Sequence, residues 1–214
     1  MKLQVYIAYA SQLELHWRHP AMKRFSRLEA ALLDKGRQVR FVTNAGIYEP
    51  GCIPSGLHVQ AGQQIRPINL VDGEGNFFLK PNGVFYIDRK KRAGILESSR
   101  FADSAIQPWL AVQSGPLLLS GGKVHPGFSP NSRHRRHRNG VGVQADGKLV
   151  FACTVTEQKT FITLHEFARF FREQGCADSL FLDGDLSRMI VDPEKPIRVR
   201  NVYAAIFAIT EAAE

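Results

Sequence analysis

The sequence has few cysteines, and this scarcity excludes two classes of small protein. Only three are present among 214 residues, and none belongs to a Cys-x-x-Cys pair. Such wide spacing fits neither a disulfide scaffold nor a zinc site. We therefore expect free, buried thiols at Cys52, Cys153 and Cys176.

The chain also lacks the apolar runs and loop motifs that mark several common functions. No apolar stretch approaches the roughly 20 residues that cross a bilayer. There is no Gly-x-Gly-x-x-Gly, no phosphate-loop Gly-Lys-Ser/Thr and no His-Glu-x-x-His, so these nucleotide and zinc-protease motifs are excluded. The opening MKLQVYIAYA predicts a first β-strand and not a signal peptide. The printed chain therefore reads as cytoplasmic, unless a longer chain carried a leader that was removed.

Positive charge is abundant and concentrated. The formal net charge is +8, and half of it comes from the arginines of one short run, RHRRHR at residues 133–138. A local concentration of this kind indicates an anionic ligand more than a uniformly basic surface.

Turn signals predict a sheet-rich fold. Hairpin turns are expected at Ala61-Gly62, Pro81-Asn82-Gly83, Gly121-Gly122 and Asp146-Gly147, each between apolar or alternating runs. No repeat, low-complexity tract or linker divides the chain. We expect one α+β domain over residues 1–214, with a mixed, largely antiparallel sheet rich in hairpins and flanked by a few helices.

Two helices are expected. Residues 21–36 place Met22, Phe25, Leu28 and Leu32 on one stripe before Gly36. Residues 163–175 open with Thr163 and Glu166 at capping-box spacing and end at Gly175. The apolar face of this second helix comprises Leu164, Phe167, Ala168 and Phe171.

The stretch SLFLDGDLSRMIV places two carboxylates, Asp183 and Asp185, just after a predicted strand. An Asp-Gly-Asp sequence can be a solvated turn. It can also be a pair in which one carboxyl group acts as a general acid while the other stays ionised. A divalent cation at Asp183 and Asp185 is a third, less favoured interpretation, and we expect no cofactor.

Three further stretches contain candidate site residues. Asn44 ends the predicted strand 38–43 and is either a turn cap or an amide that binds a sugar hydroxyl; Glu49 could supply another carboxylate. Gln113 and Ser114 interrupt two apolar runs, where a structural turn is the favoured interpretation of Ser114.

The arginine run is the third of these stretches. Side chains alternate in extended backbone, so Arg136 and Arg138 should share a face opposite Arg133 and Arg135. Arg138 adjoins the strand that begins near Val141, and a fixed guanidinium suits a phosphate oxyanion. A solvated basic loop is the alternative.

Together these stretches resemble the phosphodiester glycosidase family. TNAGIYEPGCIPSGLHVQAGQQIRPIN, GNFFLKPNGVFYI, QSGPLLL, RNGVGV and LFLDGDLSRM occur in the family's order. The resemblance runs from about Val5 to Thr210 and is closest to the compact bacterial branch. Where the animal enzyme type continues with glycines after the Asp-Gly pair, this chain has Asp185 and Leu186.

The resemblance implies a hydrolase that cleaves a sugar-1-phosphodiester in carbohydrate metabolism. The positions that match the family's motifs are Asn44, Gln113, Ser114, Arg138, Asn139 and Asp183. Two other function classes stay open: a glycan-binding domain without turnover, and a nucleic-acid binder. The second is disfavoured because no aromatic residue interrupts the run SRHRRHR.

Overall fold

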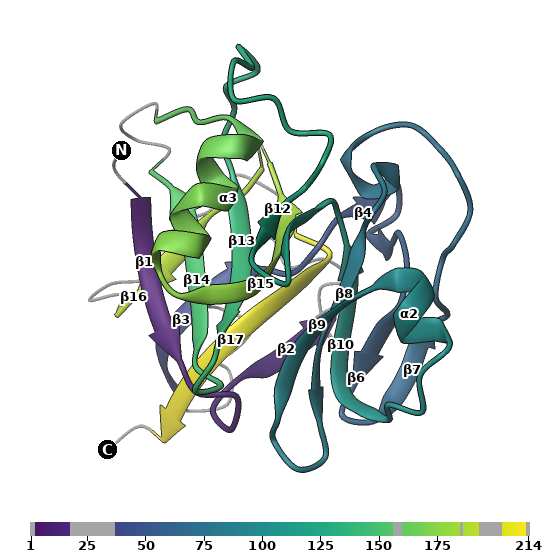
Figure 1. The fold of residues 1–214 in the computed structure, drawn as a ribbon. Coiled ribbons are helices and arrows are strands. Elements are labelled where there is room, and N and C mark those ends of the chain that lie inside the picture. Colours follow the sequence, from purple (N-terminus) through teal and green to yellow (C-terminus); the bar gives the residue numbers. More distant parts are fainter. Residues whose placement is uncertain (1–2, 18–36, 156–159, 185, 193–202, 213–214) are drawn as a thin grey trace.

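The computed structural model describes residues 3–17, 37–155, 160–184, 186–192 and 203–212 of the chain (Figure 1). Every strand pairing within these ranges is antiparallel, and two short α-helices accompany the sheets. The expected α+β class with a largely antiparallel sheet is confirmed. That one domain spans all of residues 1–214 stays a prediction, and the predicted helix over 21–36 lies outside the described ranges.

The largest sheet in the described ranges has six strands, in the order β1-β14-β13-β15-β11-β12. Asn139 and Asp183 belong to it. Its strands are β1 (Leu3–Ala8), β11 (Leu117–Ser120), β12 (Lys123–Val124), β13 (Asn139–Gln144), β14 (Leu149–Thr154) and β15 (Cys176–Asp183).

Smaller sheets pack beside it. A five-stranded sheet, in the order β7-β6-β10-β8-β9, comprises β6 (His58–Gln60), β7 (Gln63–Arg66), β8 (Gly83–Asp88), β9 (Ala93–Glu97) and β10 (Pro108–Ser114). A four-stranded sheet, in the order β16-β3-β17-β2, comprises β2 (Glu14–Trp17), β3 (Arg37–Asn44), β16 (Met189–Val191) and β17 (Ala205–Ala212). A short pair joins β4 (Tyr48–Glu49) to β5 (Ile53–Pro54).

Four buried phenylalanines connect the three larger sheets. Phe41 of β3 lies 4.9 Å from Phe151 of β14, measured between ring centroids. Phe207 of β17 lies 5.7 Å from Phe151 and 5.5 Å from Phe85 of β8. Each fully buried ring contributes roughly 1.5–3 kcal/mol through removal of apolar surface from water. The three sheets therefore share one core.

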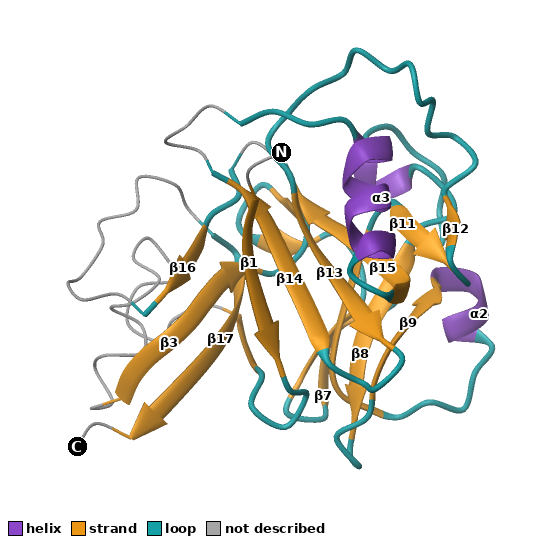
Figure 2. Cartoon of the chain, turned by 60° about the vertical axis from the view of Figure 1, so that its left-hand side comes forward, coloured by secondary structure: helices purple, strands orange, loops and turns teal. Residues whose placement is uncertain are grey.

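The helix predicted over residues 163–175 is α3 (Leu164–Glu173), and it lies over one face of the six-stranded sheet (Figure 2). Thr163 and Glu166 form the predicted capping box, and Phe167, Ala168 and Phe171 are buried. Gly142 of β13 allows this close packing, because a Cβ there would lie 2.7 Å from Phe171. The remaining helices are α2 (Ser98–Ala102) and the 3-10 helix η1 (Asn76–Phe78). None of the helices in the described part of the chain is long and apolar enough to cross a membrane.

Three of the predicted hairpin turns are present, at 61–62, 121–122 and 146–147. The turn predicted at 81–83 is wrong. Phe78 N and Leu79 N donate to Gly75 O and Asn76 O, so a 3-10 helix, and not a strand, lies directly before the turn and β8. The three cysteines are free and buried, as predicted.

Candidate active site

Two strand ends and one strand start meet at Asp183. β3 ends at Asn44, β15 ends at Asp183, and β13 begins at Asn139, the register partner of Asp183. The Asn44 amide Nδ2 donates to Asp183 Oδ2 at 3.3 Å, and Asn139 Nδ2 donates to Asn44 Oδ1 at 2.9 Å. Residues far apart in the sequence thus form one chain of hydrogen bonds with a carboxylate at its end.

The segment that follows Asp183 is a turn attached to β3. Ser187 N donates to Gly184 O at 2.8 Å, and Gly184 N donates to Asp183 Oδ1 at 2.6 Å. Arg188 N donates to Asn44 Oδ1 at 3.2 Å. The turn and the site are therefore compatible interpretations of one sequence, because one carboxylate oxygen of Asp183 contacts the turn and the other contacts Asn44.

Arg138 is held rigidly just before β13. It is only 5% exposed. Its Nε donates to Ile162 O at 3.3 Å, and its Nη2 donates to His134 O at 3.2 Å. The guanidinium carbon lies 5.5 Å from the centroid of the Phe181 ring, two residues before Asp183 on β15. These contacts fix the position of the guanidinium group at the end of the sheet.

One cavity of about 780 Å³ has both Arg138 and Asp183 in its wall. The η1 region, the loop before β13, the start of α3 and the end of β15 contribute to it. The lining residues are Asn76, Leu79, Gly127, Phe128, Ser129, Ser132, Arg133, His134, Arg136, Arg138, Leu164, His165, Asp183 and Gly184. The described lining thus carries a net positive formal charge, with one carboxylate.

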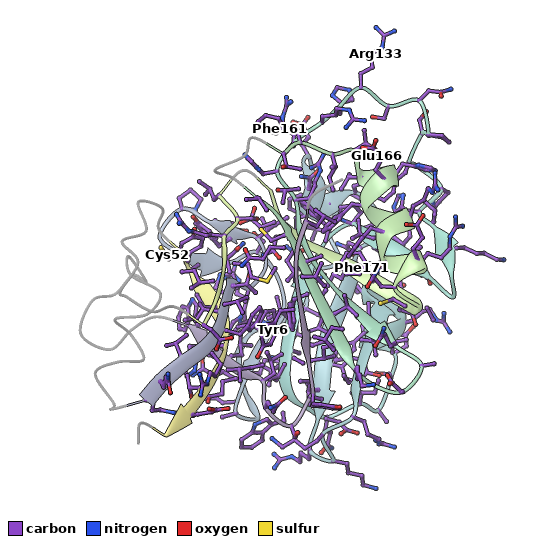
Figure 3. All side chains as sticks on the ribbon, turned by 90° about the vertical axis from the view of Figure 1, so that its left-hand side faces the viewer. Tyr6, Cys52, Arg133, Phe161, Glu166 and Phe171 are labelled. Atoms are coloured by element: carbon purple, nitrogen blue, oxygen red, sulfur yellow. The ribbon has the colours of Figure 1, made fainter. Side chains whose placement is uncertain are left out.

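The arginine run divides between the cavity and the surface. Arg136 and Arg138 both line the cavity, as the predicted alternation requires. Arg135 instead extends to Glu166 of α3, with Nη2 2.5 Å from Oε1. Arg133 also lines the cavity, so its predicted place on the opposite face is wrong. The reason is a local turn, in which Arg135 N donates to Arg133 O at 2.9 Å. Figure 3 shows Arg133 at the tip of this loop.

Gln113 lies outside the cavity lining and bonds to the protein itself. Its Oε1 accepts from Leu57 N at 3.0 Å and from Asn69 N at 2.8 Å. Its Nε2 donates to Asn69 O at 2.6 Å and to Ser98 Oγ at 3.0 Å. The amide therefore supports the segment that precedes β6 and the segment that follows β7, and its role in substrate binding stays a prediction.

Ser114 and Glu49 also lie outside the cavity lining. Ser114 is buried, and its hydroxyl donates to Leu182 O at 3.0 Å, which attaches β10 to β15 one residue before Asp183. The Glu49 carboxylate lies 3.7 Å from Arg66 Nη2 and is 44% exposed. The proposed roles of both residues stay predictions.

Tyr48 is a neighbour of the site that sequence reasoning missed. Burial raises its pKa above the ordinary value, and the negative charge of Asp183 raises the pKa further. Its phenol thus lies within electrostatic range of the carboxylate and stays protonated. Its place beside Glu49 was the available signal, whereas Asn76, Leu79 and Phe128 carry no pattern that would connect them to the cavity.

Among the residues that the structure describes, no group of three or more His, Cys, Asp or Glu side chains is placed to hold a metal ion. Asp185 lies outside the described ranges. A site that works without a metal or cofactor therefore stays a prediction.

Comparison with known proteins gives a consistent family match. The model of the family described as "Phosphodiester glycosidase" matches residues 37–206. The uncharacterized protein YigE of Escherichia coli K12 is 35% identical over 181 residues, which is 83% of this chain and 69% of that protein.

Solved structures share the fold. The catalytic domain of zebrafish N-acetylglucosamine-1-phosphodiester alpha-N-acetylglucosaminidase, auto-inhibited by its pro-peptide, superposes with a TM-score of 0.69 at 14% identity. The match covers 98% of this chain and 83% of that one. A hypothetical Synechocystis protein matches with a TM-score of 0.61 at 12% identity, covering 97% of this chain and 59% of its own. At such low identities the likeness is one of fold.

Proposed function

This chain belongs to the phosphodiester glycosidase family, and from that premise we propose that it hydrolyses glycosyl phosphodiesters in the cavity between Arg138 and Asp183. One observation carries the proposal: a buried, rigid guanidinium and a strand-end carboxylate lie in the wall of the same cavity. The reaction needs both, because an anionic leaving group must be bound next to a carbon that develops positive charge.

Arg138 binds the scissile phosphate in this proposal. A guanidinium presents several donors in one plane, which suits phosphate oxygens. Its contacts with Ile162, His134 and Phe181 orient it before substrate arrives, so little side-chain entropy is lost on binding. Neutralising the phosphate charge also makes the phosphate a better leaving group, which reduces the need for a strong general acid.

Asp183 stabilises the oxocarbenium-like transition state or attacks the anomeric carbon. The bond between that carbon and the phosphate oxygen breaks, and its electron pair leaves with the phosphate. A water oxygen then forms the new bond to carbon, and one water proton passes to a second carboxylate; where Asp183 has attacked, its bond to that carbon breaks in this step and the carboxylate is regenerated. Asp185 is our candidate for this base, since the Glu49 side chain is directed toward Arg66.

Asn44 and Asn139 position the carboxylate. Asn44 donates to Asp183 and is itself oriented by Asn139 and by the backbone of Arg188. Both asparagines are buried and lie outside the cavity lining. We therefore assign them the positioning of Asp183, and direct contact of either amide with the sugar stays a prediction.

Release of reducing sugar from sugar-1-phosphodiesters tests the proposal. Methyl N-acetylglucosamine-1-phosphate is a suitable first probe, because the zebrafish relative is named for that sugar phosphodiester. We expect turnover by the unmodified chain and near-complete loss with Asp183→Asn. An aryl glycoside without phosphate should be a poor substrate, because the phosphate is the main binding group.

Two outcomes would contradict the proposal. Equal kcat/KM on the aryl glycoside and the phosphodiester would leave a general glycosidase. Binding of the phosphodiester without any turnover across a panel of sugars would support the non-catalytic glycan-binding alternative.

A further inference from the structure

The cavity holds more positive charge than one phosphodiester can neutralise. Three arginines and one aspartate line it, which leaves a formal charge of +2 on the described lining with histidines neutral. The phosphodiester of the proposed reaction carries a single negative charge. Arg138 is the residue assigned above to the scissile phosphate, so the excess lies with Arg133 and Arg136.

Arg136 is the better fixed of these two. Its backbone forms an isolated bridge with Ile162, with hydrogen bonds of 3.1 Å in both directions. Its Nη1 donates to Arg135 O at 2.9 Å. Within the described residues no carboxylate forms an ion pair with Arg136 or Arg133.

Arg135 shows what an ordinary surface arginine does at this place. It pairs with Glu166 and donates to Phe161 O, and it does not line the cavity. Arg135, which faces away from the cavity, is therefore neutralised by Glu166. Among the described residues, the cavity-lining Arg133 and Arg136 have no acidic partner. Such an arrangement fits guanidinium groups that bind an external anion.

The spacing suits a second phosphate beside the first. Arg136 and Arg138 are two residues apart, and in extended backbone this separation is about 6–7 Å. Leu164 and His165, in the first turn of α3, also line the cavity, so the positive end of the helix dipole faces the same space. Arg133 lies at the tip of the loop, with its side chain extending outward (Figure 3), and it also belongs to the cavity lining.

We propose that the natural substrate carries a second phosphate group on its leaving side, bound by Arg136 with Arg133, while Arg138 binds the scissile phosphate. This inference rests on the proposed function. The substrate class is then a sugar-1-phosphodiester with a polyanionic aglycone. The second phosphate can be joined directly, as in a sugar diphosphate ester, or through a short alcohol, as in a phosphorylated glycerol.

The test compares three substrates with the same sugar. The first is the methyl phosphodiester, with one phosphate. The other two carry a second phosphate: a sugar-1-phosphodiester whose alcohol is glycerol phosphate, and a sugar ester of a nucleoside diphosphate. We expect kcat/KM at least about tenfold higher for one of the two doubly phosphorylated substrates than for the methyl ester. The substrate that gains identifies the linkage. Equal kcat/KM on all three would overturn the inference, while turnover of the methyl ester would still support the proposed function.

Arg136→Ala, alone and with Arg133→Ala, assigns the preference to these side chains. We expect the ratio between doubly and singly phosphorylated substrates to fall to within about threefold. Arg135→Ala is the matched control, since it removes one charge from the same run outside the cavity, and it should keep the ratio. A ratio that survives Arg136→Ala and the double substitution would overturn the inference.

Calorimetry with hydrolysis products separates this inference from the proposed function. Glycerol bisphosphate and inorganic pyrophosphate are each titrated into the protein, and their dissociation constants are compared with that of glycerol monophosphate. Tighter binding of either doubly phosphorylated compound, lost in Arg136→Ala, would support the second anion site even if no substrate turns over. If single-stranded DNA of equal phosphate concentration competes as well as these compounds do, the surface is a general polyanion site and the inference is wrong.

Discussion

Two stretches of this chain carry the same number of lysines and arginines in opposite settings. Residues 133–138 contain four arginines, and residues 89–92 read RKKR. The first stretch lies in the loop at the top of Figure 1, and the second is the turn between β8 and β9 at the bottom. Only the first contributes to the cavity with Asp183.

The difference lies in the structural element that each stretch adjoins. Arg138 continues directly into β13 and is buried, so its charge is fixed in the wall of the cavity that Asp183 also lines. Arg92 is on an exposed turn, with a side chain 74% exposed that pairs with Asp88 of the same hairpin at 2.7 Å. Arg89 and Lys91 lie over the ring of Trp109. The basic run that we propose as a binding site is thus the one that a strand and a cavity fix in place, whereas the number of charges alone does not distinguish the two stretches.

The largest effect should come from Asp183, because only the cavity stretch shares its cavity with the carboxylate that we propose as catalytic. Asp183→Asn keeps the size and turn propensity of the side chain but removes its charge. We expect a loss of at least about a hundredfold in kcat, the low end for a general acid–base group. The measurement is kcat together with the melting temperature.

Asp88→Asn is the matched control in the hairpin, and it should leave kcat unchanged. Asp185→Asn should lose less than Asp183→Asn, because Asp185 is where the chain departs from the animal pattern. If the Asp183 variant loses activity and its melting temperature falls as well, the aspartate is structural and the site assignment fails.

The second effect, on binding, compares Arg138 with arginines that are exposed. Arg138→Ala should weaken binding of a sugar-1-phosphodiester about ten- to a hundredfold, because a charge-assisted contact contributes roughly 1.5–3 kcal/mol. Arg133→Ala should cost far less on a singly charged substrate, and Arg92→Ala should cost nothing measurable. Dissociation constants from calorimetry check this order. Equal, small effects at positions 138 and 133 would mean that the run is a solvated loop.

The third effect is on stability and comes from His58, a buried residue outside both basic stretches. Burial lowers the pKa of His58 on β6 to about 4, and neither ring nitrogen has a hydrogen-bond partner among the described residues. The folded state therefore binds fewer protons than the unfolded state below pH 6.5, and stability falls as the pH falls toward 4. We expect a loss of about 2 kcal/mol between pH 8 and pH 5.

Denaturant unfolding at several pH values measures this loss. His58→Leu should flatten the dependence. An unchanged slope in that variant would assign the acid sensitivity to other groups.

Much of the local structure could be predicted from the sequence. The capping box at Thr163 and Glu166 correctly begins α3, because it satisfies the helix's first backbone donors with side chains only three residues apart. The glycine turn at 121–122 is equally local. The turn at 81–83 was predicted wrongly, since the same residues also serve after a 3-10 helix, where Asn82 donates to Phe77 O.

Contacts between distant segments could be predicted only in part. Asn44 and Asp183 were both expected at strand ends, yet no local pattern shows that β3 and β15 end side by side. Gln113 shows a second limit. Its amide bonds to backbone atoms of the protein, and no pattern in the sequence distinguishes such an amide from one that contacts substrate. The cavity wall from η1 and from the loop at Phe128 likewise depends on long-range packing.

The smallest effect concerns the hairpin, and it tests whether its charge acts at a distance. Arg89→Glu with Lys90→Glu reverses two exposed charges at the end of the molecule away from the cavity. At about 0.15 M salt the screening length is roughly 8 Å, so kcat/KM for a phosphodiester should stay within about twofold. At about 0.01 M salt the screening length rises to roughly 30 Å, and a decrease of up to about threefold in kcat/KM should appear, since a less positive protein attracts an anionic substrate more weakly. Arg133→Glu, which introduces one negative charge at the mouth of the cavity, should lower kcat/KM at both salt concentrations. A tenfold loss from the hairpin variant at 0.15 M salt would show that residues 89–92 take part in binding, and the distinction between the two basic stretches would be wrong.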